Sequence, residues 1–195
     1  MLYILCIIVA YLLGSVPMGL ILTKLAGQGD LRRVGSGNIG ATNVMRVGGL
    51  RMAVLAWALD MAKAIVAVFI GWTAIGPTFA AWCGFAAVVG HCFPIWLRFH
   101  GGKGISSMFG MILAISPLTF IICGIEWLIV ALSFGFSSLG AIVVMCLLPF
   151  FGFAIGGGIG WAFLATALLC LWRHRENIVR LLNGTESRIQ WKWKK

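Results

Sequence analysis

The chain has 195 residues, of which 61% are hydrophobic and only 10% are charged. Soluble domains carry about 25% charged residues. This composition, with a mean hydropathy of +1.02, therefore excludes a soluble globular domain and predicts a polytopic membrane protein. No linker divides the chain, so we expect a single polytopic membrane domain over residues 1–195. None of the six cysteines forms a CxxC pair or a Cys/His cluster, and neither a metal site nor a disulfide is predicted.

Apolar runs between clusters of basic residues predict the helices. The first run, residues 2–23, is long for the apolar core of a signal peptide and has no basic region before it, so we expect a retained helix. Its Gly14-Ser15-x-Pro17-x-Gly19 pattern predicts close packing and a proline kink. Further apolar runs cover residues 52–74, 77–97, 105–123, 125–135, 139–154 and 159–172.

The positions of Lys and Arg predict the topology. Seven crossings place all of them on one side except Lys63, which lies inside a predicted helix, and leave the opposite loops near residues 75, 125 and 157 without any. The positive-inside rule makes the basic side cytoplasmic. We therefore predict an all-α membrane protein with seven transmembrane helices, its N-terminus outside and its C-terminus cytoplasmic. Residues 173–195 would form a cytoplasmic interfacial tail.

The run 125–135 is too short for this topology on its own, because at about 1.5 Å per residue it cannot cross a hydrocarbon core of roughly 30 Å. We expect it to extend through residues 136–138, to be shielded by neighbours or to form a re-entrant segment. Ser137 and Ser138 are expected at its cytoplasmic end, facing protein or water.

The first polar stretch, residues 35–46, reads Gly-Ser-Gly-Asn-Ile-Gly-Ala-Thr-Asn-Val-Met-Arg. Glycine-rich backbone can approach a ligand closely and offer N–H groups to an anion. Ser, Asn and Thr add hydrogen-bonding groups, and Arg46 adds a planar cation suited to phosphate. The pattern favours a phosphate-handling loop at the membrane surface over a polar loop that merely joins two helices.

A second polar stretch, residues 100–107, combines three glycines and Lys103 with the start of a predicted helix, which is the local chemistry of a phosphate cradle. It is not a Walker A loop, because Leu97 and Gly104 stand where glycine and Ser or Thr are required. A glycine-rich turn with an interfacial lysine explains it equally well.

A third polar stretch follows the last predicted helix. His174 and Asn177 share one side of a helix there, although the segment alone is more typical of a solvated basic helix. The tail through Trp191–Lys195 is expected at the lipid headgroups.

Asp60, Lys63 and His91 are ionisable residues inside predicted helices. Asp60 and Lys63 are interpreted as a structural ion pair that supports the loop above, and His91 as a helix–helix hydrogen bond. There is no HExxH, GxSxG, His-x₄-Asp or Asp-rich motif, so metal-assisted chemistry is not expected.

Three motifs together resemble the acyl-phosphate-dependent glycerol-3-phosphate acyltransferases of bacteria. They are Ser36-Gly-Asn-Ile-Gly-Ala-Thr-Asn43-x-x-Arg46, Gly101-Gly-Lys-Gly104 and His174-Arg-x-Asn-Ile-x-Arg-Leu-x-x-Gly184-x-Glu186. The Gly14–Gly19 pattern and Asp60-x-x-Lys63 are also similar to that family, so the likeness spans residues 14–186. His100, Ala64 and Ser106-Ser107 depart from the family pattern without removing a group assigned to chemistry.

The resemblance implies seven transmembrane helices and transfer of a fatty acyl group from acyl phosphate to the 1-hydroxyl of sn-glycerol 3-phosphate. The products are lysophosphatidic acid and phosphate, in the first acylation step of phospholipid biosynthesis. It implies no cofactor, no nucleic acid, contact with membrane lipid, and coupling to an enzyme that forms acyl phosphate. The location would be the bacterial plasma (inner) membrane, with the active site on the cytoplasmic face.

The resemblance also implies roles for individual residues. The catalytic residues would be Ser36, Lys103, His174 and Asn177. The substrate and phosphate-binding residues would be Asn38, Thr42, Asn43, Arg46, Gly101, Gly102, Gly104, Ser137 and Ser138. No covalent acyl-enzyme is expected. The proton of the attacking hydroxyl would go to His174 or to an oxygen of the acyl phosphate, and the second is favoured because no carboxylate is evidently placed to orient His174.

Two other classes of protein remain as alternatives. A transporter or binding protein for a phosphorylated solute fits the basic pocket, but the polar groups crowd one face and no internal repeat is seen. A structural membrane scaffold leaves the three polar motifs unexplained.

Overall fold

The computed structural model describes residues 1–189, and the tail expected at Trp191–Lys195 lies outside that part. The described chain forms nine α-helices and two short 3₁₀ turns, η1 and η2. The helices are α1 Leu2–Gly14, α2 Met18–Leu25, α3 Ala41–Ala74, α4 Pro77–Cys92, α5 Ile105–Ile115, α6 Pro117–Phe134, α7 Ser137–Ile155, α8 Gly157–Arg173 and α9 Arg175–Leu182. The turns are η1 Leu31–Arg33 and η2 Ile95–Leu97.

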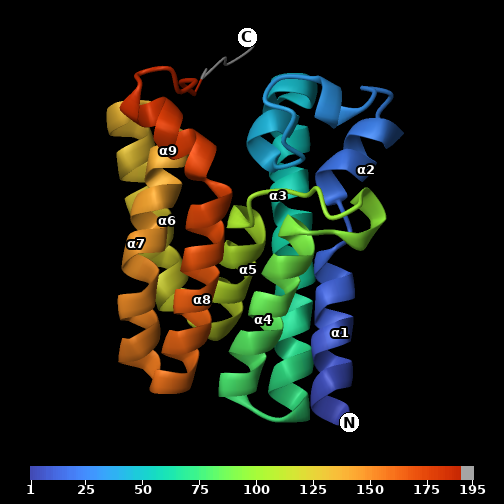
Figure 1. Ribbon diagram of the computed structural model, residues 1–195, viewed down its shortest axis with the longest axis vertical. Helices are drawn as coiled ribbons and strands as arrows, with labels where there is room; N and C mark the ends of the chain where they lie inside the picture. Colours follow the sequence, from blue (N-terminus) through green and yellow to red (C-terminus); the bar gives the residue numbers. More distant parts are fainter. Residues whose placement is uncertain (190–195) are drawn as a thin grey trace.

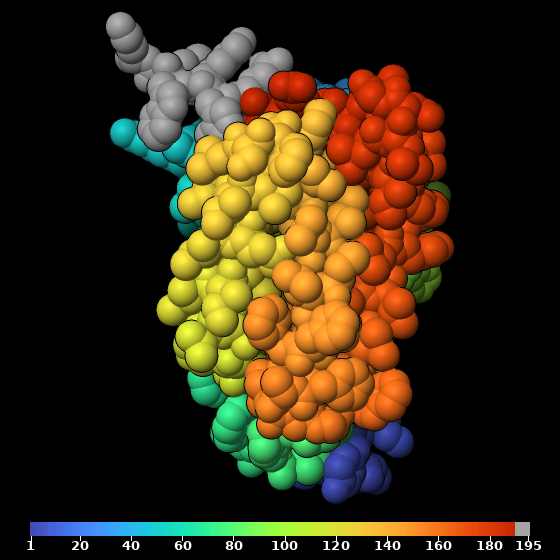
Figure 2. All heavy atoms as spheres, turned by 90° about the vertical axis from the view of Figure 1, so that its left-hand side faces the viewer, coloured from blue at the N-terminus to red at the C-terminus, as the bar shows by residue number. Residues whose placement is uncertain are grey.

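The helices form an elongated bundle. In Figure 1, α1, α3 and α4 stand on one side, α6, α7 and α8 stand on the other, and α5 lies between them. We call the end that carries α9 and the loop after α2 the basic end; the N-terminus lies at the opposite end (Figure 1). Figure 2 shows α6 and α7 running side by side over the outer face of the second group.

The first predicted helix is interrupted rather than merely kinked. Pro17 has no N–H to donate, and α1 ends at Gly14 before α2 restarts at Met18. The close packing expected around this pattern is confirmed. A Cβ on Gly14 would lie 2.1 Å from the carbonyl oxygen of Ala87, and one on Gly19 would lie 2.3 Å from that of Ile39. Backbones therefore touch at both glycines.

The second helix starts much earlier than predicted. We expected residues 52–74, and α3 runs from Ala41 to Ala74 with a kink at Gly49, whose φ is 78°. The polar loop is therefore shorter than the stretch 35–46, because Thr42, Asn43 and Arg46 already lie on α3.

The predictions of a helix over residues 105–123 and of a short run over 125–135 are wrong. The chain turns at Ser116, so that α5 ends at Ile115 and α6 continues from Pro117 to Phe134. Ser116 caps α6 by accepting the N–H of Thr119 at 3.2 Å, and proline occupies the first helical position, where a missing N–H costs nothing. The Ser-Pro pair was the signal for this boundary. The turn predicted near residue 125 therefore lies near Ser116.

Within residues 1–189, five spans are long and apolar enough to cross a membrane: Leu2–Leu25, Ala41–Ala74, Pro77–Leu97, Pro117–Phe134 and Ser137–Ile155. The helices α5 and α8 are apolar but shorter. Both run along the bundle in Figure 1.

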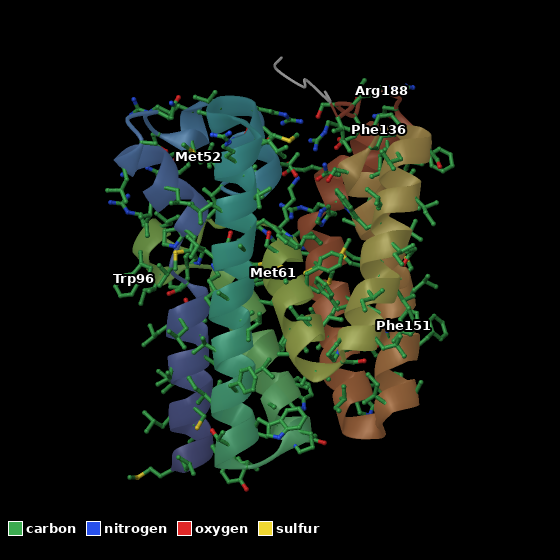
Figure 3. The ribbon with its side chains drawn as sticks, turned by 180° about the vertical axis from the view of Figure 1, so that it is seen from behind. Met52, Met61, Trp96, Phe136, Phe151 and Arg188 are labelled. Atoms are coloured by element: carbon green, nitrogen blue, oxygen red, sulfur yellow. The ribbon has the colours of Figure 1, made fainter. Side chains whose placement is uncertain are left out.

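Small residues set the contact between α3 and α5. A Cβ on Gly110 would lie 2.3 Å from the carbonyl oxygen of Met61, so the two backbones meet directly. Figure 3 shows Met61 on the side of α3 that meets α5. Because lipid tails are as apolar as leucine, such close packing, rather than the hydrophobic effect, holds membrane helices together.

Candidate active site

The second and third polar motifs meet below the basic end. The ammonium of Lys103, in the loop before α5, donates a hydrogen bond to the side-chain oxygen of Asn177 on α9. The amide nitrogen of Asn177 donates to Glu186 Oε1 at 2.7 Å. Ser138, at the start of α7, donates to the same oxygen at 2.8 Å. Three of the predicted site residues, Lys103, Asn177 and Ser138, are thus joined through one carboxylate.

That carboxylate, Glu186, was not among the predicted site residues. Its side chain is only 6% exposed, and Arg180 donates to its second oxygen at 2.7 Å. Burial raises the pKa of Glu186, but the hydrogen bonds from Arg180, Ser138 and Asn177 outweigh burial and leave the pKa below its ordinary value of 4.5. Its place at the end of the third motif was visible in the sequence, but its partners on α7 and α9 were not.

The loop that carries Lys103 is clamped to the helix ends around it. The amides of Gly101 and Gly102 donate to the carbonyls of Cys92 and His91 at 3.1 and 3.0 Å. Their own carbonyls accept the guanidinium of Arg173 at 2.9 and 3.1 Å. The backbone hydrogen bonds of these two glycines are therefore already made.

The amides just beyond these glycines differ. The N–H groups of Lys103, Gly104 and Ile105 donate no hydrogen bond within residues 1–189. This narrows the expected cradle to the N-terminus of α5, where the helix dipole also favours an anion. Glycine is required at residue 104, because its φ is 88° and a Cβ there would lie 2.7 Å from the sulfur of Cys170.

Lys103 lies in a partly desolvated position. Burial lowers the pKa of its ammonium below the ordinary value of 10.5, and the neighbouring guanidinium of Arg180 lowers it further. The concentration of positive charge around a buried lysine is what an anionic ligand would relieve.

His174 lies one residue beyond α8 and is 4% exposed. Its Nδ1 lies 2.7 Å from the carbonyl oxygen of Cys170, and because a carbonyl only accepts, Nδ1 carries the proton. Burial lowers the pKa of His174 to about 4, so the ring is neutral at physiological pH. Its Nε2 is therefore an acceptor, held in a fixed orientation by a backbone carbonyl rather than by a carboxylate.

The stretch 35–46 divides into an anchor and exposed groups. Asn43 is 1% exposed; its nitrogen donates to the carbonyls of Leu31 and Val34, and its oxygen accepts the N–H of Ser36 at 3.1 Å. This side chain holds the loop in place. The side chains of Ser36 and Thr42 are exposed, and Asn38 is half-buried.

The segment after α9 links this stretch to the rest of the site. The guanidinium of Arg46 donates to the hydroxyl of Ser187 at 2.8 Å, and the N–H of Ile189 donates to the carbonyl of Gly135 at 2.8 Å. Figure 3 shows Arg188 beside Phe136, where its guanidinium lies 5.3 Å from the ring centre. Of the predicted residues, Arg46 thus joins the site through this segment. The backbone carbonyl of Ser137 instead accepts a hydrogen bond from the indole N–H of Trp127.

Within residues 1–189, no group of three or more His, Cys, Asp or Glu side chains is arranged to hold a metal ion. The chemistry that the site offers is a lysine and arginines for anions, hydrogen-bonding amides and hydroxyls, and a neutral histidine. Many of its polar atoms are held in place by one another, which fixes their positions before a ligand binds.

A bundle of apolar helices with a cluster of cationic and hydrogen-bonding side chains at one end defines an integral membrane protein with a polar site. The chain belongs to the glycerol-3-phosphate acyltransferase family, whose family model matches residues 4–184. It is therefore an acyltransferase of phospholipid biosynthesis.

Individual relatives agree with this assignment. A glycerol-3-phosphate acyltransferase of Paramagnetospirillum magneticum is 46% identical over 182 residues, covering 92% of this chain and 90% of the relative. One of Rhizobium etli is 43% identical over 183 residues, covering 93% and 89%.

Two solved structures have the same fold. The glycerol 3-phosphate form of PlsY (YgiH), an integral membrane glycerol 3-phosphate acyltransferase, matches with a TM-score of 0.91 and 36% identity over 96% of both chains. The lysophosphatidic acid form of PlsY matches with a TM-score of 0.89 and 34% identity, covering 95% of this chain and 94% of that one.

Proposed function

We propose that this acyltransferase moves a fatty acyl group from acyl phosphate to the 1-hydroxyl of sn-glycerol 3-phosphate. The products are lysophosphatidic acid and inorganic phosphate. The observation that carries the proposal is the cluster of Lys103, Asn177, Ser138 and Arg180 around Glu186. Both proposed substrates carry phosphate, and this cluster supplies cations and donors at the end of a helix.

Within the site, the ammonium of Lys103 and the free amides of residues 103–105 hold one phosphate. Asn177, Ser138 and Arg46 orient the other phosphate, with Arg46 exchanging Ser187 and Ser138 exchanging Glu186 for it. Ser36, Asn38 and Thr42 lie on the loop side of the site and add further donors. Acyl phosphate is already activated, so positioning and charge stabilisation are the main tasks of the protein.

The proton of the attacking hydroxyl goes to a non-bridging oxygen of the acyl phosphate. His174 Nε2 can accept a hydrogen bond from that hydroxyl and orient it, but a pKa of about 4 makes the ring a weak base. The acyl carbon forms a bond to the 1-oxygen of glycerol 3-phosphate, and its bond to the phosphate oxygen breaks. Hydrogen phosphate leaves and carries the proton.

No covalent acyl-enzyme forms in this reaction. A serine nucleophile needs a neighbouring base. The hydroxyl of Ser138 instead donates to Glu186, a carboxylate whose own pKa is depressed.

The orientation follows from charge. We propose seven crossings, with α5 and α8 completing the five long spans, and with the basic end in the cytoplasm. The protein then lies in the bacterial plasma membrane, where it receives glycerol 3-phosphate from the cytoplasm and the acyl chain from the bilayer. We also propose functional coupling to an enzyme that forms acyl phosphate, because this donor must be supplied to the membrane.

The test is to mix purified protein with acyl phosphate and glycerol 3-phosphate, without metal or coenzyme A, and to measure phosphate and lysophosphatidic acid. Equal amounts of both products support the proposal. Activity only with acyl-coenzyme A, or a protein-bound acyl group after quenching, would overturn it.

A further inference from the structure

A buried cluster of three ionisable side chains lies beneath the loop that carries Lys103. Asp60 and Lys63 come from α3 and His91 comes from α4, and all three are at most 5% exposed. The ammonium of Lys63 lies 2.7 Å from Asp60 Oδ1, which confirms the predicted ion pair. Charged groups inside a membrane bundle are costly, so the presence of this pair calls for a role beyond filling space.

The contacts of Lys63 orient the ring of His91. The ammonium has three N–H groups and three acceptors, namely Asp60 Oδ1, the carbonyl of Val16 at 2.9 Å and His91 Nδ1 at 3.0 Å. An ammonium cannot accept, so Nδ1 is the acceptor in the contact with Lys63, and the same nitrogen lies 3.4 Å from Asp60 Oδ1. Lys63 thus holds the ring by one edge, at the break between α1 and α2.

The opposite edge of the ring supports the glycine loop. A Cβ on Gly102 would lie 2.0 Å from His91 Nε2, so the imidazole lies directly against the backbone of this residue. The N–H of Gly102 donates to the carbonyl of His91 at 3.0 Å, and Arg173 holds its carbonyl from the other side. The ring therefore sets the position of Gly102, one residue before Lys103.

We propose that Asp60, Lys63 and His91 are positioning residues for Lys103. Lys63 orients the ring, the ring fixes the backbone of the loop, and the loop directs the Lys103 side chain to Asn177. The inference rests on the proposed function only in assigning a substrate phosphate to Lys103. None of the three side chains touches substrate, and each acts through the loop.

The contact between the ring and Gly102 can be tested by complementary substitutions. Gly102→Ala places a methyl group where the ring lies and displaces the loop. His91→Asn keeps an acceptor at the position of Nδ1 for Lys63 but removes the far edge of the ring. We expect Gly102→Ala to raise KM for glycerol 3-phosphate or for acyl phosphate by about tenfold or more. His91→Asn/Gly102→Ala should recover about tenfold of that loss, because the methyl group then has space. Gln reaches the position of Nε2, so His91→Gln/Gly102→Ala should not recover.

The matched control is Gly124→Ala on α6, where a Cβ would meet no atom within 4 Å. It should leave kinetics and Tm unchanged. If the His91→Asn protein does not accumulate, His91→Ser takes its place in the double variant with Gly102→Ala, because serine also leaves the space beside Gly102 empty.

A purely structural role gives a different result from a positioning role. It would lower Tm for each substitution, leave KM of the folded fraction unchanged and show no mutual rescue, and this result would overturn the inference. The same variants are used to measure the affinity for glycerol 3-phosphate by calorimetry, in the absence of an acyl donor. If wild-type protein binds glycerol 3-phosphate but does not use acyl phosphate, the proposed donor is wrong, while the rescue of affinity still tests the positioning role.

Discussion

Lys103 and Asn177 lie 74 residues apart in the chain and meet through a hydrogen bond from the ammonium to the amide oxygen. The orientation of that amide is decided by Glu186, which accepts from its nitrogen. A cation, an amide and a carboxylate therefore form one chain of contacts across the loop before α5, α9 and the segment that follows α9.

Replacing either end of the contact should abolish turnover in a folded protein. Lys103→Ala removes the cation at the cradle and Asn177→Ala removes its orienting partner. By analogy with the loss of a transition-state donor, each should lower kcat by about 10²-fold or more. Phosphate release and Tm of purified protein measure the two effects. Near-normal activity in either variant would contradict the site assignment.

The activity should fall at alkaline pH as Lys103 loses its proton. Because its pKa lies below the ordinary 10.5, the loss should begin at lower pH than for a free lysine. Folding disfavours the charged amine relative to the unfolded chain. This cost to stability is fully present below the folded pKa and disappears as pH rises from that pKa to the unfolded value of 10.5. Lys103→Arg stays charged and should move the alkaline limb upward, even if its maximal rate is reduced. If the alkaline side of the pH–activity profile does not move in Lys103→Arg, a group other than Lys103 causes the loss of activity.

His174 should leave no mark on the pH profile near its ordinary pKa of 6.5. The ring is neutral down to a pKa of about 4, so activity between about pH 5.5 and 7.5 should not rise with a histidine titration. His174→Ala should still lower the rate, because the substrate hydroxyl loses its acceptor. If the activity of the wild-type protein shows an inflection near pH 6.5 and this inflection disappears in His174→Ala, then His174 is the general base.

Glu186 should stabilise the protein in a pH-dependent way. Its folded pKa is depressed below 4.5, so the stabilisation is present above that value and is lost as pH falls through the folded pKa. Glu186→Gln should lower Tm at pH 7, because Arg180 then faces a neutral amide, and should flatten the dependence of Tm on pH between about 3 and 6. Equal slopes in variant and wild type would contradict this role.

Asn43 should prove to be an anchor for the loop rather than a ligand. Its amide makes three hydrogen bonds to backbone atoms, and Asn43→Ala leaves those groups unpaired at a cost of about 1–3 kcal/mol. Tm should fall, and activity should fall with the folded fraction. Asn183→Ala, at an exposed position, is the control. A large loss of activity at unchanged Tm would contradict this and indicate that Asn43 binds substrate.

The sequence by itself determined the class of protein, the order of the apolar segments and the polar motifs. The high apolar content indicates a membrane protein, and a membrane span requires an apolar run of a given length. Both the class and the order of the apolar segments can therefore be read from the sequence alone. The C-terminal ends of α3 and α8 and the ion pair of Asp60 and Lys63 followed from local patterns. The boundary at Ser116 was also local, but apolar residues on both sides concealed it.

Only the tertiary structure decided which polar groups meet. The sequence placed Lys103, Ser138 and Asn177 in separate motifs, and the pairing through Glu186 depends on how α5, α7 and α9 pack. The tertiary structure likewise shows that the amides of Gly101 and Gly102 are bonded to α4, whereas those of residues 103–105 donate to no group within residues 1–189. A motif gives the donors and acceptors that a segment carries, but packing decides which of them are used within the protein and which remain for a substrate.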